Sequence, residues 1–93
     1  MSSEYVYPAT VFVKMHTLKQ QIEKAESEIF EVHQLLGRKN VNLDRVAEEV
    51  EDVIQVLETM RRNLQENHGV MVNRARAKVV RKNRARNYYE GGM

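Results

Sequence analysis

Four acidic side chains stand out by their spacing. Glu28 and Glu31 are three residues apart, and Glu49 and Asp52 repeat that interval after 17 intervening residues. Residues three apart share one face of a helix, so each pair would offer two carboxylates in one direction. Carboxylate oxygens are the ligands that Mg²⁺ and Mn²⁺ prefer. The spacing therefore predicts a divalent metal site, provided that two packed helices carry the pairs.

The apolar residues around these acids follow a helical period. That period predicts one helix from Thr10 to about Leu36, with Gly37 as its C-terminal stop. Asn42 is a suitable N-cap for a second helix, which we expect to run to about Asn67 before His68-Gly69. Because the connection between the two helices is short, they should be antiparallel neighbours with facing apolar stripes.

A third helix is predicted over residues 70–85. The expected fold is therefore all-α: an antiparallel helical hairpin plus a third helix. Residues 1–9 form an irregular lead, residues 10–86 the helical domain, and residues 87–93 a tail. A chain of 93 residues buries only a modest core. We therefore expect the hairpins to assemble into a helical-bundle oligomer.

On a helical projection, one acid of each pair lies within the apolar stripe. Glu28 and Glu49 take this inner position, and Glu31 and Asp52 lie at the edge of the stripe. Carboxylates are seldom placed on a buried stripe unless something compensates their charge. A divalent cation would do so. The alternative is a solvated or salt-bridged face, in which Glu28 pairs with Lys24.

The charges of the chain are unevenly distributed. Residues 1–66 hold 12 of the 13 acidic side chains, whereas residues 67–93 hold 7 of the 15 basic ones and a single acid, Glu90. The third helix carries most of these bases on one face. They could bind a polyphosphate at the carboxylates or lie along a nucleic-acid backbone, and a solvated basic face is the simpler alternative.

Two segments and the closing residues together resemble a known family. Residues 22–32 (IEKAESEIFEV) and 46–56 (VAEEVEDVIQV) resemble the E-x-x-E and E-x-x-D helices of MazG-like all-α nucleoside triphosphate pyrophosphohydrolases. Residues 82–89 (KNRARNYY) are similar to the family's closing K-N-x-x-R-G and aromatic residue. Ser27 stands where many members have an acid, and Asn87 replaces the expected Gly, although Asn tolerates left-handed backbone.

The resemblance implies cleavage of a nucleoside triphosphate to a monophosphate and pyrophosphate, with Mg²⁺ (or Mn²⁺) as cofactor. It implies four metal ligands: Glu28, Glu31, Glu49 and Asp52. Lys82 and Arg86 would contact phosphate, and Lys78 joins them from its helical face. A water activated by the metal would be the nucleophile, with Glu48 as its candidate partner. Family members assemble as dimers or tetramers, so a homodimer or homotetramer is expected.

Two other functions fit the same residues. One is a non-enzymatic helical dimer that binds nucleic acid through the basic helix. The other, within the enzyme class, is a phosphoribosyl-ATP pyrophosphohydrolase, which the closing segment favours less. The chain has no Cys and shows neither a signal peptide nor a run of about 18 apolar residues. We therefore expect a cytoplasmic protein that does not enter a membrane.

Overall fold

A computed structural model describes residues 5–92, which form an all-α fold without strands. Residues 1–4 of the predicted lead, and the last residue of the predicted tail, lie outside the described residues. The elements, in chain order, are the α-helices α1 (Phe12–Met15), α2 (Leu18–Leu36), α3 (Leu43–His68) and α4 (Val72–Ala85), and the 3₁₀ turn η1 (Glu90–Gly92). Within this part of the chain, no helix combines the length and apolar character needed to cross a membrane.

The prediction of one continuous helix from Thr10 to Leu36 is wrong, because the chain breaks between α1 and α2. Thr17 is extended (φ −73°, ψ 164°) and caps α2. Its Oγ1 accepts a hydrogen bond from the Gln20 amide at 3.1 Å, and the Gln20 side chain accepts one from the Thr17 amide at 2.8 Å. This reciprocal capping box satisfies two amides that would otherwise lack partners.

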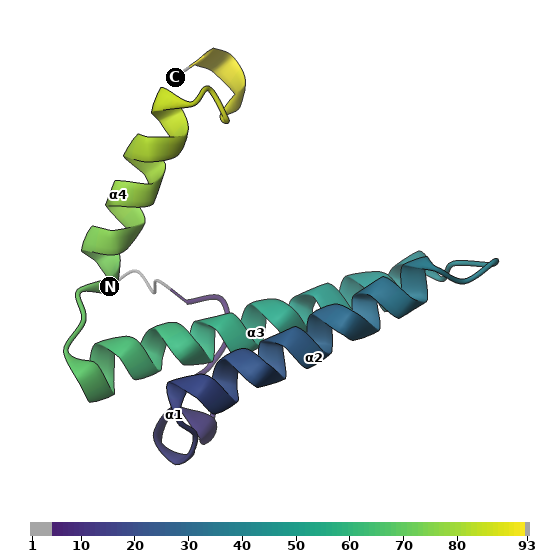
Figure 1. The fold of residues 1–93 in the computed structure, drawn as a ribbon, viewed down its shortest axis with the longest axis horizontal. Helices are drawn as coiled ribbons and strands as arrows, with labels where there is room; N and C mark the ends of the chain where they lie inside the picture. The colour runs from purple at the N-terminus through teal and green to yellow at the C-terminus, as the bar shows by residue number, and fades with distance from the viewer. Residues whose placement is uncertain (1–4, 93) are drawn as a thin grey trace.

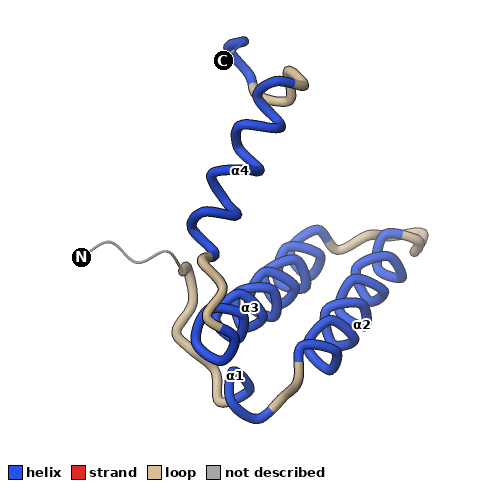
Figure 2. The backbone as a smooth tube through the Cα atoms, turned by 60° about the vertical axis from the view of Figure 1, so that its left-hand side comes forward, coloured by secondary structure: helices blue, strands red, loops and turns tan. Residues whose placement is uncertain are grey.

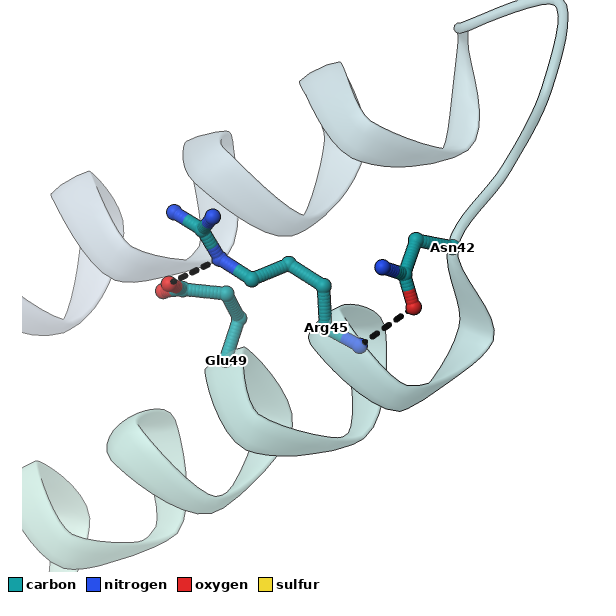
Figure 3. Close-up of polar contacts among 3 residues, drawn as sticks. All are labelled: Asn42, Arg45 and Glu49. Carbon is teal, nitrogen blue, oxygen red and sulfur yellow. Dashed lines mark hydrogen bonds and ion pairs between the residues drawn. The ribbon is translucent and has the colours of Figure 1, made fainter.

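The two long helices, α2 and α3, lie side by side (Figures 1 and 2). The chain reverses between them over residues 37–42. Asn42 caps α3 as predicted, since its Oδ1 accepts a hydrogen bond from the Arg45 amide at 3.1 Å (Figure 3). At the other end, Gly69 adopts a left-handed φ of 66°, and the Val70 amide bonds to the Leu64 carbonyl at 2.9 Å. Such a closure ends a helix sharply, as expected at His68-Gly69.

Buried amides join α1, α2 and α3, in addition to the buried apolar residues Val13, Ala25 and Leu35. Gln21 and Asn63 are each 2% exposed. Asn63 Nδ2 donates to Gln21 Oε1 at 3.0 Å and to the His16 carbonyl at 3.1 Å. Asn67 Nδ2 in turn donates to Asn63 Oδ1 and to the Val13 carbonyl, both at 2.8 Å. The network donates hydrogen bonds to the Val13 and His16 carbonyls, which the break at Thr17 leaves without helical partners.

The described part of the lead, residues 5–9, follows α3 rather than standing free. The Glu58 carboxylate, 6% exposed, accepts the Val6 amide at 2.7 Å and the Tyr7 amide at 2.8 Å. Arg62 donates to the Tyr7 carbonyl at 2.9 Å, and its guanidinium lies 4.1 Å from the centre of the Tyr5 ring. The lead is therefore fixed by specific polar contacts along α3.

The last α-helix, α4, leaves the α2–α3 pair at Gly69 and projects away from it (Figures 1 and 2). It begins at Val72, two residues later than predicted, and Val72 is the one buried residue among those of α4. Asn87, after its end, has a φ of 60°, so the left-handed conformation expected of the missing Gly is present.

Candidate metal centre

Three carboxylates from α2 and α3 converge between the two helices. Glu28 and Glu31 from α2 and Glu49 from α3 each offer an oxygen, and these oxygens lie within 4.8 Å of one another. The geometry follows from the sequence spacing, because the i, i+3 pair on α2 presents both acids to the facing side of α3. The three ligands are of the type that a hard divalent cation prefers.

The inner and edge positions predicted for the acids are confirmed by their burial. Glu28 and Glu49 are each 9% exposed, whereas Glu31 and Asp52 are exposed. A nearly buried carboxylate must be compensated, since removing its charge from water is costly. The partners of Glu28 and Glu49 therefore decide whether the acids are structural or await a ligand.

Compensation within the chain is incomplete. Lys24 Nζ lies 2.9 Å from Glu28 Oε1, and Arg45 Nε lies 3.5 Å from Glu49 Oε1 (Figure 3). The second oxygen of Glu49, Oε2, is buried and has no hydrogen-bond partner. A buried acceptor without a donor costs free energy. Glu49 thus has a buried oxygen without a hydrogen-bond partner within a group of acids, and a bound cation would supply that partner.

The pKa values of the acids reflect their crowding. Hydrogen bonding to Glu49 and then to Glu28 raises the pKa of Glu31, since a proton shared among carboxylates relieves their repulsion. The hydrogen bond from Lys24 lowers the pKa of Glu28. Desolvation, followed by the charge of Glu28, raises the pKa of Asp52. A divalent cation would neutralise the same crowded negative charges.

Asp52 lies beside the group of three rather than in it. It lines a cavity of about 550 Å³ together with Glu28 and Lys24. The remaining lining residues come from the segment before α1, from α1, from the α1–α2 break, and from α2 and α3: Thr10, Phe12, His16, Gln21, Gln55, Val56 and Thr59. The rings of Phe12 and His16 stack at 4.6 Å between centroids. The cavity thus joins an acidic end to an aromatic and amide-lined end.

Glu48, the candidate partner of the nucleophile, is exposed on α3 and belongs neither to the group of three nor to the cavity lining. Its charge reaches Asp52, whose pKa it helps to raise. Lys78, Lys82 and Arg86 are exposed on α4 and at its end, and α4 points away from the carboxylates (Figure 1). Within one chain, the predicted phosphate-binding bases are not brought to the acids.

The cavity residues Phe12, His16 and Gln21 were not among the predicted site residues. They reach the cavity because the chain breaks before Thr17 and folds α1 back, and the only sequence signal for that break is the Thr17–Gln20 capping pair. Arg45 was also missed. Its signal is the interval of four residues to Glu49, the same interval that separates Lys24 from Glu28.

No protein-family model, characterised protein or solved structure matches this chain.

Proposed function

We propose that the chain is a Mg²⁺-dependent nucleoside triphosphate pyrophosphohydrolase of the MazG-like kind. The observation that carries the proposal is the buried, unpartnered Glu49 Oε2 within a group of three carboxylates beside a cavity. This donor set fits Mg²⁺ or Mn²⁺, because it consists of oxygens and contains one that lacks any other partner. Glu28, Glu31 and Glu49 would hold the cation, with Asp52 adjacent on the cavity wall.

The cavity suits the nucleoside part of the substrate. Its volume of about 550 Å³ falls within the range of small-molecule sites, roughly 300–1,000 Å³. The stacked Phe12 and His16 rings offer an aromatic wall for a base, and Gln55 offers an amide. The phosphates would then lie toward Asp52 and Glu28, where Lys24 supplies positive charge.

In the proposed reaction, a water oxygen bonds to the α-phosphorus and the bond from that phosphorus to the bridging oxygen breaks. The products are a nucleoside monophosphate and pyrophosphate. A bound divalent cation supplies Lewis acidity and neutralises phosphate charge. Glu48 is the candidate acceptor of the water proton. The cavity walls orient the triphosphate, and such positioning accounts for much of phosphoryl-transfer catalysis.

The proposal includes assembly of the chain with a second copy of itself. Large apolar side chains remain exposed along the paired helices: Ile22, Ile29, Phe30, Leu36, Val50 and Leu57. Burying them between copies of the α2–α3 hairpin would give the dimer or tetramer expected from the small core. In such an assembly, α4 of one copy could carry Lys78, Lys82 and Arg86 to the carboxylates of another.

The decisive experiment measures pyrophosphate release from a panel of ribo- and deoxyribonucleoside triphosphates, with Mg²⁺ and with EDTA. Wild type is compared with Glu49→Gln and with Glu26→Gln, an exposed acid of α2 outside the group of three. We expect metal-dependent release that is lost in Glu49→Gln and retained in Glu26→Gln. Absence of release from every triphosphate by folded protein would refute the proposal.

The projecting, basic α4 favours one alternative, a helical dimer that binds nucleic acid. Of its basic side chains, Arg74, Lys78 and Lys82 are all exposed, and α4 itself projects away from the α2–α3 pair (Figure 1). Phosphate-backbone binding would make affinity fall steeply with salt. A DNA-binding titration at several salt concentrations tests this alternative. Salt-sensitive binding that Lys78→Met and Lys82→Met weaken, together with no triphosphate hydrolysis, would support it.

A further inference from the structure

The two inner acids share a second feature, which is a base four residues earlier on the same helix. Lys24 Nζ lies 2.9 Å from Glu28 Oε1 on α2, and Arg45 Nε lies 3.5 Å from Glu49 Oε1 on α3. Figure 3 shows the Arg45 side chain extending along α3 to the Glu49 carboxylate. The repeated pattern is thus a base, an inner acid and an edge acid on each of two facing helices.

These ion pairs are weak enough to open. The side chains of Lys24 and Arg45 are 60% and 58% exposed, so water competes for both cations. The order of base before acid is the less favourable one on a helix, because it opposes the helix dipole. Partly exposed pairs of this kind contribute little to stability. Stability therefore gives little reason for a base beside both inner acids.

A divalent cation would compete with these bases for the same carboxylates. Glu28 Oε1 and Glu49 Oε1 accept the bases, and both residues belong to the three whose oxygens lie within 4.8 Å of one another. The unpartnered, buried Glu49 Oε2 independently indicates that a ligand belongs there. Once the carboxylates bind a cation, the ammonium and the guanidinium lose their partners while they remain anchored beside the site.

The freed Lys24 would then face the cavity in which the proposed function places the phosphates, and the freed Arg45 would lie beside the carboxylates, outside the cavity lining. Lys24 lines the same cavity as Glu28 and Asp52. Arg45 has a planar guanidinium, which binds phosphate through two parallel hydrogen bonds. The helix α4, by contrast, projects away from the α2–α3 pair that carries the carboxylates (Figures 1 and 2). Lys24 and Arg45 are therefore the cations that one chain places at its own metal centre.

We propose that Lys24 and Arg45 are exchangeable counterions: they pair with Glu28 and Glu49 until a divalent cation binds, and then bind the polyphosphate of the substrate. The identity of that ligand, a polyphosphate complexed with a divalent cation, rests on the proposed function. The exchange requires opposite effects from one substitution. Removing a base should strengthen metal binding, because a competitor is lost, and should weaken polyphosphate binding, because a contact is lost.

The test uses the full chain carrying Lys24→Met and Arg45→Met, with Lys19→Met as the control base, since Lys19 is exposed on α2 and outside the cavity. Mn²⁺ alone is titrated by electron paramagnetic resonance. Inorganic triphosphate complexed with Mn²⁺ is then titrated by calorimetry, so that base preference plays no part. Circular dichroism verifies that each variant is folded.

For Mn²⁺ alone, we expect the double variant to bind about twofold to fivefold more tightly than wild type, as the loss of weak competing pairs predicts. For the triphosphate complex, we expect the double variant to bind about tenfold more weakly than wild type. Lys19→Met should change neither. The variant Arg45→Lys keeps the charge but not the fork, so it should bind Mn²⁺ like wild type and triphosphate with intermediate affinity.

The proposal is overturned if the double variant binds Mn²⁺ no more tightly than wild type, or binds triphosphate equally well. It is also overturned if wild type binds no Mn²⁺. Failure of the proposed function looks different: wild type would then bind Mn²⁺ and triphosphate but release no pyrophosphate from any nucleotide. In that case the opposite shifts in the two affinities would still support the exchange.

Discussion

The Glu49→Gln variant should be more stable than wild type in EDTA and less stable than wild type in Mg²⁺. Glu49 is 9% exposed, and its Oε2 has no hydrogen-bond partner. An unsatisfied buried group costs about 1–3 kcal/mol, whereas the partly exposed pair with Arg45 contributes about 0–1 kcal/mol. The neutral amide also removes repulsion from Glu28 and Glu31 and can donate to either. We therefore expect a gain of roughly 1 kcal/mol in EDTA.

The assay is thermal unfolding followed by circular dichroism at one fixed protein concentration, because assembly would make Tm depend on concentration. For a domain of this size, 1 kcal/mol corresponds to about 4–8 °C in Tm. Mg²⁺ at a hundred times its Kd should stabilise wild type by about 2.7 kcal/mol and Glu49→Gln much less. The order of the two Tm values should therefore reverse between EDTA and Mg²⁺.

Glu58→Gln is the matched comparison, because Glu58 is a buried acid with partners for both of its oxygens. Its two oxygens accept the Val6 and Tyr7 amides at 2.7 and 2.8 Å. In Gln, the NH₂ group replaces one of the two accepting oxygens, so one backbone amide would face another donor instead of an acceptor. We expect a loss of about 1–3 kcal/mol that Mg²⁺ does not change.

The outcome that would refute this reasoning is a Glu49→Gln protein that is less stable than wild type by 1 kcal/mol or more in EDTA. Glu49 would then be a structural acid like Glu58, and the metal centre would lose its main support. Equal stabilisation of both proteins by Mg²⁺ would refute the ligand assignment as well.

Three further predictions concern the elements that shape the cavity. Asn63→Ala should lower the free energy of unfolding, measured with urea, by about 2–4 kcal/mol. Asn63 is 2% exposed, and its removal leaves Gln21 Oε1 without a donor. A decrease below about 0.5 kcal/mol would contradict this. Thr17→Ala should cost about 1 kcal/mol by the same measurement, through loss of the capping box; an unchanged midpoint would mean that the break has another cause. The hydrogen bond to Glu51 raises the pKa of Tyr7 to about 12, so phenolate absorbance at 295 nm, taken as the difference from Tyr7→Phe, should appear near that pH and shift down in Glu51→Gln. Because the raised pKa favours the protonated phenol in the folded chain, this contribution to stability is present below pH about 10 and disappears as pH rises to about 12.

The placement of the acids on the two helices is the part of the structure that sequence reasoning predicted best. The inner position of Glu28 and Glu49 and the edge position of Glu31 follow from helical periodicity alone, and their burial and exposure agree. Helix ends marked by Asn42 and Gly69 were predicted for the same kind of reason, since a side-chain cap and a left-handed glycine act within a few residues of the chain.

The break before Thr17 could not be predicted with equal ease, because two local signals compete there. An apolar period runs through residues 10–36 and favours one helix, whereas Thr17 and Gln20 form a capping box. The capping box prevails because Asn63 and Asn67, more than 40 residues away, bind the His16 and Val13 carbonyls that the break exposes. Those partners become available only when α3 packs against α1.

Local features and long-range features of this protein therefore have different origins. The sequence by itself determined the ends of α3 at Asn42 and Gly69 and the direction in which the inner acids point, since each depends on residues about a turn apart. Only the tertiary structure decided that Glu49 Oε2 is left without a partner, that α1 closes a cavity beside Glu28 and Asp52, and that α4 projects away. These features depend on long-range contacts, whose energies local spacing does not encode.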